Sequence, residues 1–147
     1  MLDRAWICAR IPHHGRMCLL DAVTAWSDAT IACRAVSHRD PANPLREAGQ
    51  LGAAAGIEYG AQAMAVHGAL LAGVEGKPSH GYLASVRGVT LHVPRLDDLE
   101  GELEIGAQRL SGDASMILYA FAIDHRGQRL LDGRAAVMLE AREGRAR

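Results

Sequence analysis

Residues 56–70, GIEYGAQAMAVHGAL, are apolar on nearly every side of a helix and carry one carboxylate, Glu58, in the first turn. Such a helix needs burial on nearly every side, because it has no polar face to present to water. A carboxylate is seldom buried without a partner, although the positive end of the helix dipole favours an acid in the first turn. The pattern predicts a buried helix over Gly56–Leu71 with an acid at the mouth of an apolar pocket.

Segments typical of strands lie on both sides of this helix. They cover 18–26, 29–36, 81–93, 101–110, 114–124 and 128–141. Residues 37–55 are rich in Pro, Gly and polar side chains and predict a long loop, of a kind that is more often functional or lid-like. The order predicts an α+β fold in one domain over 1–147, with a frayed end at 142–147. A curved antiparallel sheet would wrap around the one long helix, as in the hotdog fold.

Charge and hydropathy exclude several classes of function. A formal net charge of -1 and the lack of a basic cluster argue against a nucleic-acid partner. The stretch 57–74 is nearly long enough to cross a membrane, but Glu58, Gln62 and His67 make a membrane span a poor interpretation. The N-terminus has no apolar core of a signal peptide.

The three cysteines are Cys8, Cys18 and Cys33. Their number is odd and they lack the spacing of metal ligands, so the sequence predicts ordinary buried thiols and no metal. Free thiols are typical of a reducing compartment, and we expect a cytoplasmic location.

Three stretches resemble the β-hydroxyacyl-(acyl carrier protein) dehydratases, especially the divergent branch of aryl-polyene-type biosynthetic clusters. They are IPHHGRMCLLDAV at 11–23, SHRDPANPLREAGQL at 37–51 and GIEYGAQAMAVHGAL at 56–70. They are similar to the family's opening Pro-His pattern, the branch's Ser-His…Asn-Pro-Leu loop and the Glu-x-x-x-Gln of the central helix. With the strand order, the resemblance covers nearly the whole chain.

The resemblance implies a hydro-lyase that removes water from a 3-hydroxyacyl thioester and forms a trans-2-enoyl thioester. The substrate would be carried on the phosphopantetheine of an acyl carrier protein, and no cofactor would be needed. A histidine would act as the base at the α-carbon, because imidazole titrates near neutral pH, and a helix acid would protonate the departing hydroxyl.

The resemblance assigns the acid to Glu58. The family's Gly-His-Phe-Pro segment is replaced here by EAGQLG, without a histidine, so His38 becomes the candidate base. The backbone at the start of the helix, Gly56 and Ile57, would bind the thioester carbonyl, since the first N–H groups of a helix have no partner within it. Gln62, one turn after Glu58, would contact the substrate or equally satisfy a buried carbonyl.

For the other polar residues we favour structural or solvent-exposed roles. For His13 and His14 we favour a structural or pocket-wall role, and for His67 a hydrogen-bonded core position. Arg39 and Arg46 are candidates for the phosphate of the pantetheine arm or for an acidic carrier protein, although solvated loop arginines are more frequent.

Two alternatives stay open at this point. One is a hotdog acyl-thioesterase, and the other is a non-catalytic subunit that pairs with an active dehydratase. A single hotdog leaves a sheet edge and one helix face incompletely covered, so we expect a homodimer or a heterodimer with another dehydratase. In the family, one site takes its histidine and its acid from different subunits, which would bring His38 of one chain to Glu58 of the other.

Overall fold

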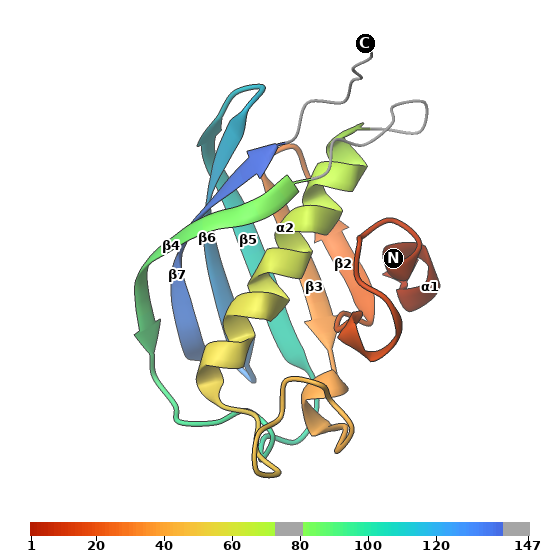
Figure 1. Cartoon of the computed structure of the whole chain (residues 1–147), viewed down its shortest axis with the longest axis vertical. Coiled ribbons are helices and arrows are strands. Elements are labelled where there is room, and N and C mark those ends of the chain that lie inside the picture. Colours follow the sequence, from red (N-terminus) through yellow and green to blue (C-terminus); the bar gives the residue numbers. More distant parts are fainter. Residues whose placement is uncertain (73–80, 140–147) are drawn as a thin grey trace.

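The computed structural model describes residues 1–72 and 81–139, in which one long helix, α2, lies across a curved seven-stranded sheet (Figure 1). The helices are α1 (Arg4–Cys8) and α2 (Gly56–Ala72), with the 3-10 helices η1 (Gly15–Met17), η2 (Ser37–Arg39) and η3 (Ala53–Ala55). The strands are β1 (Leu2–Asp3), β2 (Ala22–Trp26), β3 (Thr30–Ala35), β4 (Gly81–Leu91), β5 (Leu103–Gly112), β6 (Met116–His125) and β7 (Gln128–Leu139). The predicted hotdog arrangement is confirmed.

The strand order is β1-β2-β3-β5-β6-β7-β4, and every neighbouring pair is antiparallel. The helix prediction ends one residue early, and the strand that we expected over 18–26 begins only at Ala22. The sequence did not indicate the short elements β1 and α1 at the N-terminus. The predicted frayed end, 142–147, lies outside the described residues.

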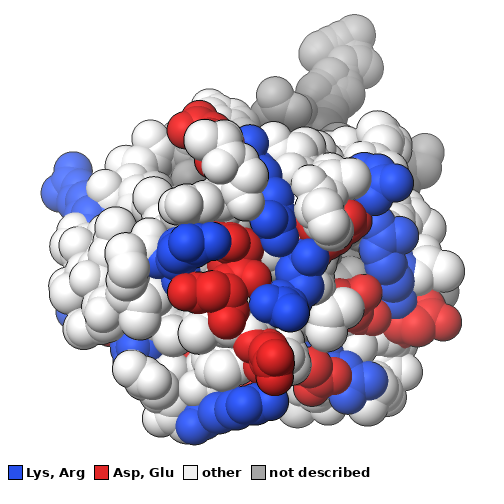
Figure 2. All heavy atoms as spheres, turned by 90° about the horizontal axis from the view of Figure 1, so that it is seen from below, with Lys and Arg blue, Asp and Glu red and all other residues white. Residues whose placement is uncertain are grey.

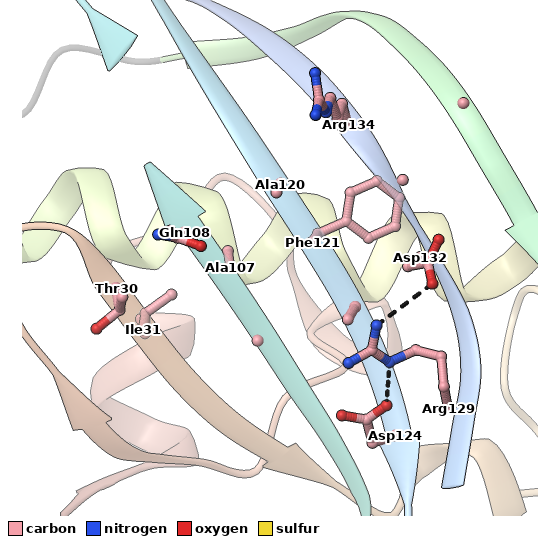
Figure 3. A pocket seen from close by; sticks show the side chains of 14 residues that line it. Thr30, Ile31, Ala107, Gln108, Ala120, Phe121, Asp124, Arg129, Asp132 and Arg134 are labelled. Atoms are coloured by element: carbon pink, nitrogen blue, oxygen red, sulfur yellow. Dashed lines mark hydrogen bonds and ion pairs between the residues drawn. The ribbon is translucent and has the colours of Figure 1, made fainter. Parts of the chain in front are cut away.

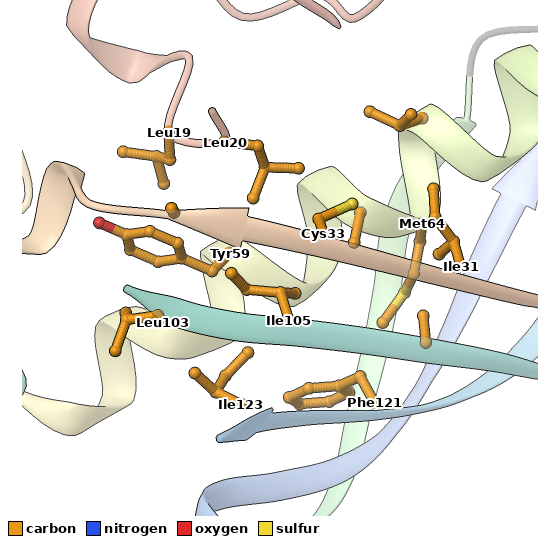
Figure 4. Close-up of a cluster of buried hydrophobic side chains, with 14 of the residues drawn as sticks. Leu19, Leu20, Ile31, Cys33, Tyr59, Met64, Leu103, Ile105, Phe121 and Ile123 are labelled. Carbon is orange, nitrogen blue, oxygen red and sulfur yellow. The ribbon is translucent and has the colours of Figure 1, made fainter. Parts of the chain in front are cut away.

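The face of α2 that contacts the sheet forms the core. Tyr59, Met64 and Val66 are buried there against strand residues such as Ile105 and Phe121 (Figure 4). Gly60 permits the close approach of helix and sheet, because a Cβ at this position would lie 2.8 Å from Cδ2 of Phe121. The alternation of apolar and polar residues in β5 and β6 follows from this packing, since every second side chain faces the helix.

The other face of α2 is only partly covered. Glu58, Ala61, Ala65, Gly68 and Ala69 are all half-buried and lie on one helical stripe. Side chains of the sheet reach only part of that stripe, and this differs from the burial on nearly every side that the apolar sequence predicts for a single chain. The expected uncovered helix face is therefore present.

The loop predicted over 37–55 is held by side-chain hydrogen bonds. The side chain of Asn43 donates to the carbonyl of Ser37 and to the hydroxyl of Tyr59 and accepts from the backbone N–H of Leu45. Asn43 is buried, and two 3-10 helices shape the loop around it. Hydrogen bonds between side chains and backbone thus hold the segment that the composition predicts as a long loop.

The prediction of three free thiols is wrong for two of the cysteines. Cys8 and Cys18 form a disulfide, with their Cα atoms 5.9 Å apart, and Cys33 is free and buried. Burial in apolar surroundings raises the pKa of the Cys33 thiol to about 12, which makes it unreactive. Because two of the three cysteines form a disulfide, the cysteines no longer argue for a reducing compartment. The cytoplasmic location stays a prediction.

Candidate active site

The segment between α1 and η1 brings His13 to the first turn of α2. Its Nε2 lies 3.1 Å from Oε2 of Glu58, although the two residues are 45 positions apart. The side chains of His13 and Glu58 are 26% and 33% exposed, so a substrate can reach both. A histidine and a carboxylic acid in direct contact form a pair that can pass a proton between them.

Gln62 holds the chain that follows His13. Its Oε1 accepts from the N–H of Leu19 at 2.9 Å, and its Nε2 donates to the carbonyl of Met17 at 2.6 Å. Gln62 is fully buried. Both ends of its amide are therefore occupied by backbone, which favours the second of the two predicted roles, namely satisfying a buried carbonyl.

His38 does not meet Glu58 in this chain. It lies in η2, where its Nε2 is 2.8 Å from the carbonyl oxygen of Leu99, and none of its surface is exposed. Burial lowers the pKa of His38 and keeps the ring neutral. A fully buried ring cannot touch an acid of a second subunit unless the loop opens, so this geometry gives the predicted base role no support.

The start of α2 differs from the expected arrangement of free N–H groups. The 3-10 helix η3 runs directly into α2, and the N–H of Gly56 donates to the carbonyls of Ala53 and Ala54. Gly56 is packed against Leu131, and Ile57 is half-buried. Binding of a thioester carbonyl at Gly56 and Ile57 stays a prediction, and the Gly56 N–H is not available for it in this conformation.

His67 has the core position that the sequence favours. Its Nε2 donates to the carbonyl of Ser27 at 2.8 Å, so its Nδ1 accepts from the hydroxyl of Tyr119, also at 2.8 Å. Burial raises the pKa of Tyr119 to about 12, which keeps this hydroxyl protonated. Both ring nitrogens of His67 are hydrogen-bonded, and neither partner is Glu58. We therefore interpret the role of His67 and Tyr119 as structural.

The half-buried stripe of α2 leads from Glu58 to a small apolar cavity of about 40 Å³. Pro12, Ala65, Gly68, Tyr119 and Val137 are among its lining residues. Pro12 adjoins His13 in the sequence, and Ala65 lies two turns after Glu58 on the same helix, but neither His13 nor Glu58 lines this cavity.

Two larger hollows, of about 550 and 600 Å³, lie on the outer face of the sheet, away from α2. Figure 3 shows the first, in which Arg129 bonds to Asp124 and to Asp132. Neither His13 nor Glu58 lines these hollows.

The end of the molecule where α2 begins carries many charges of both signs (Figure 2). Arg39 donates to the carbonyl of Asp97, and Arg46 donates to the carbonyls of Gly49 and His38. Hydrogen bonding to Arg95 holds the pKa of Asp97 well below its usual range. Arg39 and Arg46, for which the sequence left open a phosphate contact or a solvated position, thus bind backbone carbonyls and brace the loop.

No helix within residues 1–72 and 81–139 has the length and hydropathy that a membrane crossing requires. No group of three His, Cys, Asp or Glu side chains is placed to hold a metal ion in this part of the chain.

Comparison with known proteins gives a family and a fold. The family model described as ApeP-like, ApeP dehydratase, matches residues 6–144. The structure of the dehydratase heterocomplex ApeI:P from Xenorhabdus doucetiae is similar, with a TM-score of 0.83 and 26% identity over 92% of this chain and 91% of that chain. No curated protein sequence matches significantly.

Other solved structures share the fold. A hypothetical thioesterase with coenzyme A from Streptococcus pneumoniae has a TM-score of 0.60 at 10% identity, over 83% of this chain and 87% of that one. Thioesterase superfamily member 2 from Mus musculus has a TM-score of 0.56 at 14% identity, over 81% of each chain. At these identities the likeness is of the fold alone.

The sequence stretch 11–23 contained the signal for His13, in the Pro-His-His at 12–14, but it offered no reason to prefer this histidine over His38. The contact with Glu58 supplies that reason.

Proposed function

Because the chain belongs to the ApeP-like dehydratase family, we propose that it removes water from a 3-hydroxyacyl thioester carried by an acyl carrier protein. The product would be a trans-2-enoyl thioester. The observation that carries this proposal is the contact between His13 and Glu58 at 3.1 Å, in a position open to a substrate.

In the proposed reaction, neutral His13 takes the proton from the α-carbon. The electron pair of that C–H bond forms the double bond, the C–O bond at the β-carbon breaks, and protonated Glu58 donates its proton to the departing hydroxyl, which leaves as water. His13 then holds one proton too many and Glu58 one too few. Their direct contact supports return of the proton from His13 to Glu58, which restores the starting state. The steps need no cofactor and no metal.

We also propose that the chain works as a dimer, with a second copy or with another dehydratase. The strand β4 is at the edge of the sheet, pairs with β7 on one side only, and exposes Tyr82 and Leu83. An exposed edge strand of 11 residues is a ready surface for pairing with another chain. The similar structure is a dehydratase heterocomplex, which supports a second dehydratase as the partner.

The test is dehydration of a 3-hydroxyacyl carrier protein, followed by the loss of the mass of water, with the purified chain alone and with a second dehydratase. We expect His13→Gln and Glu58→Gln each to lower kcat by about 10²- to 10⁴-fold while the protein stays folded. The exposed neighbour provides the matched control, His14→Gln, which leaves kcat unchanged.

The same assay separates the alternatives. A thioesterase would release the free carrier thiol, whereas dehydration leaves the thioester intact. A non-catalytic partner subunit would give an active heterodimer even with His13→Gln and Glu58→Gln together. Activity that survives His13→Gln but is abolished by His38→Gln in folded protein would return the base to the residue that the sequence predicts.

A further inference from the structure

The disulfide between Cys8 and Cys18 closes the loop that carries His13. His13 lies midway between the two cysteines, which are separated by 10 positions in the sequence. The two positions on either side of the ring, Pro12 and His14, are exposed, and the polar contact of the ring is with Glu58. The position of His13 therefore depends on how the two ends of the loop are held.

The two ends are held differently. The end at Cys18 is tied to α2 by the two hydrogen bonds of Gln62. Arg4 of α1 donates to the carbonyls of Gly15 and Cys18 and so joins the two ends by non-covalent contacts. The end at Cys8 belongs to α1, a helix of five residues whose Ile7 is buried. The disulfide joins this short helix covalently to the end that Gln62 anchors.

We propose that the Cys8–Cys18 disulfide positions His13 against Glu58 and makes the site sensitive to dithiol reductants. Opening the disulfide removes the covalent link between the two ends of the loop and leaves the α1 end to the hydrogen bonds of Arg4 and the packing of Ile7 and Ile11, while Gln62, the sheet and α2 keep the rest of the fold. The inference rests on the proposed role of His13, and it predicts an oxidised form that is more active than the reduced form.

The redox step balances with a small dithiol as the reductant. One thiolate of the dithiol attacks the sulfur of Cys8, which is half-buried, and Cys18, which is 1% exposed, leaves as a thiolate. The second thiolate of the reductant then displaces Cys8. Two electrons and two protons pass to the protein, giving two thiols, and the reductant becomes a cyclic disulfide.

The first measurement counts thiols by mass after alkylation in denaturant. Air-oxidised protein should take up one alkyl group, at Cys33, and protein treated with dithiothreitol should take up three. Three free thiols in the air-oxidised protein would overturn the proposal.

The second measurement compares dehydration by the two forms. We expect kcat to fall by about tenfold to a hundredfold on reduction, because a displacement of about 1 Å at a catalytic group costs that much, and to recover on reoxidation. The double variant Cys8→Ser/Cys18→Ser should behave as the reduced protein and ignore dithiothreitol. The control Cys33→Ser should keep the redox response.

A third measurement reads the position of His13 without turnover. In the oxidised protein, Glu58→Gln should move the NMR signals of the His13 ring, and in the reduced protein it should not, because the pair has separated. If the His13 signals respond to Glu58→Gln only in the oxidised protein but the protein shows no dehydratase activity, the positioning role would be supported and the proposed function would be refuted. Coupling and kcat that are both unchanged by reduction would refute the positioning role. Global unfolding on reduction, followed by circular dichroism, would equally refute it.

Discussion

Replacing Gln62 by methionine should destabilise the protein without acting on the substrate directly. Methionine nearly keeps the volume of the side chain, so little cavity forms, but it removes the bonds to the N–H of Leu19 and the carbonyl of Met17. A buried polar group left without a partner costs about 1–3 kcal/mol. Leu19 is fully buried, whereas Met17 is half-buried and water can partly replace its bond.

We therefore expect the free energy of unfolding to fall by about 3 kcal/mol, with about 2 from the N–H and about 1 from the carbonyl. This corresponds to a decrease in Tm of about 6–12 °C for a chain of this size. The assay is urea unfolding followed by far-UV circular dichroism. The matched control is Gln108→Met, on an exposed position of β5, which should change stability by less than about 0.5 kcal/mol.

A second variant, Gln62→Glu, tests the direction of the hydrogen bonds. The introduced carboxyl can donate to the carbonyl of Met17 only when it is protonated, so its pKa in the folded state should be raised. Its stabilising effect is then present at low pH and is lost as the pH rises through that pKa. A loss of less than about 1 kcal/mol in Gln62→Met, together with a large increase in KM, would refute the structural role and favour substrate binding by Gln62.

Two further predictions concern packing and pH. Gly60→Ala should lower the free energy of unfolding by about 1–3 kcal/mol in urea titrations, because the new Cβ would lie 2.8 Å from Phe121. In the same helix, the new Cβ of Gly68→Ala would have no neighbouring atom within 4 Å, so this control should stabilise the protein by up to about 1 kcal/mol. Burial lowers the pKa of His38 and His67 below 6.5, so the unfolded state binds more protons than the folded state near that pH. The free energy of unfolding should therefore fall as the pH drops below 6.5. A free energy of unfolding that does not change with pH, or a pH dependence that His67→Gln leaves equally steep, would contradict this.

Local patterns in the sequence predict the long helix and most of the strands. The apolar run from Gly56 predicts α2 to within one residue, since the sequence GVEGKPSHG, with three glycines and a proline, follows at 73–81. Alternation predicts the strands after α2 to within two residues at the ends described. A helix or strand depends chiefly on the periodicity of its own residues, which a sequence displays directly.

The loop over 37–55 shows where such patterns stop being informative. Its composition indicates an open segment, but Asn43 and Tyr59 hold it closed through hydrogen bonds. The partners of a polar side chain in an irregular segment depend on which other segments fold beside it. Composition does not contain that information.

One residue of the candidate site can be recognised from local sequence and the other cannot. Glu58 is recognisable from the sequence because its place in the first turn of an apolar helix is a local property. Its partner is not recognisable, because His13 reaches it from an irregular loop 45 positions away. That loop is held by the buried amide of Gln62 and by the packing of Ile7, which join distant parts of the chain, and it is closed by the disulfide between Cys8 and Cys18. The residues themselves dictate the helix, the strands and the position of Glu58, whereas the contact between His13 and Glu58 forms only in the assembled chain.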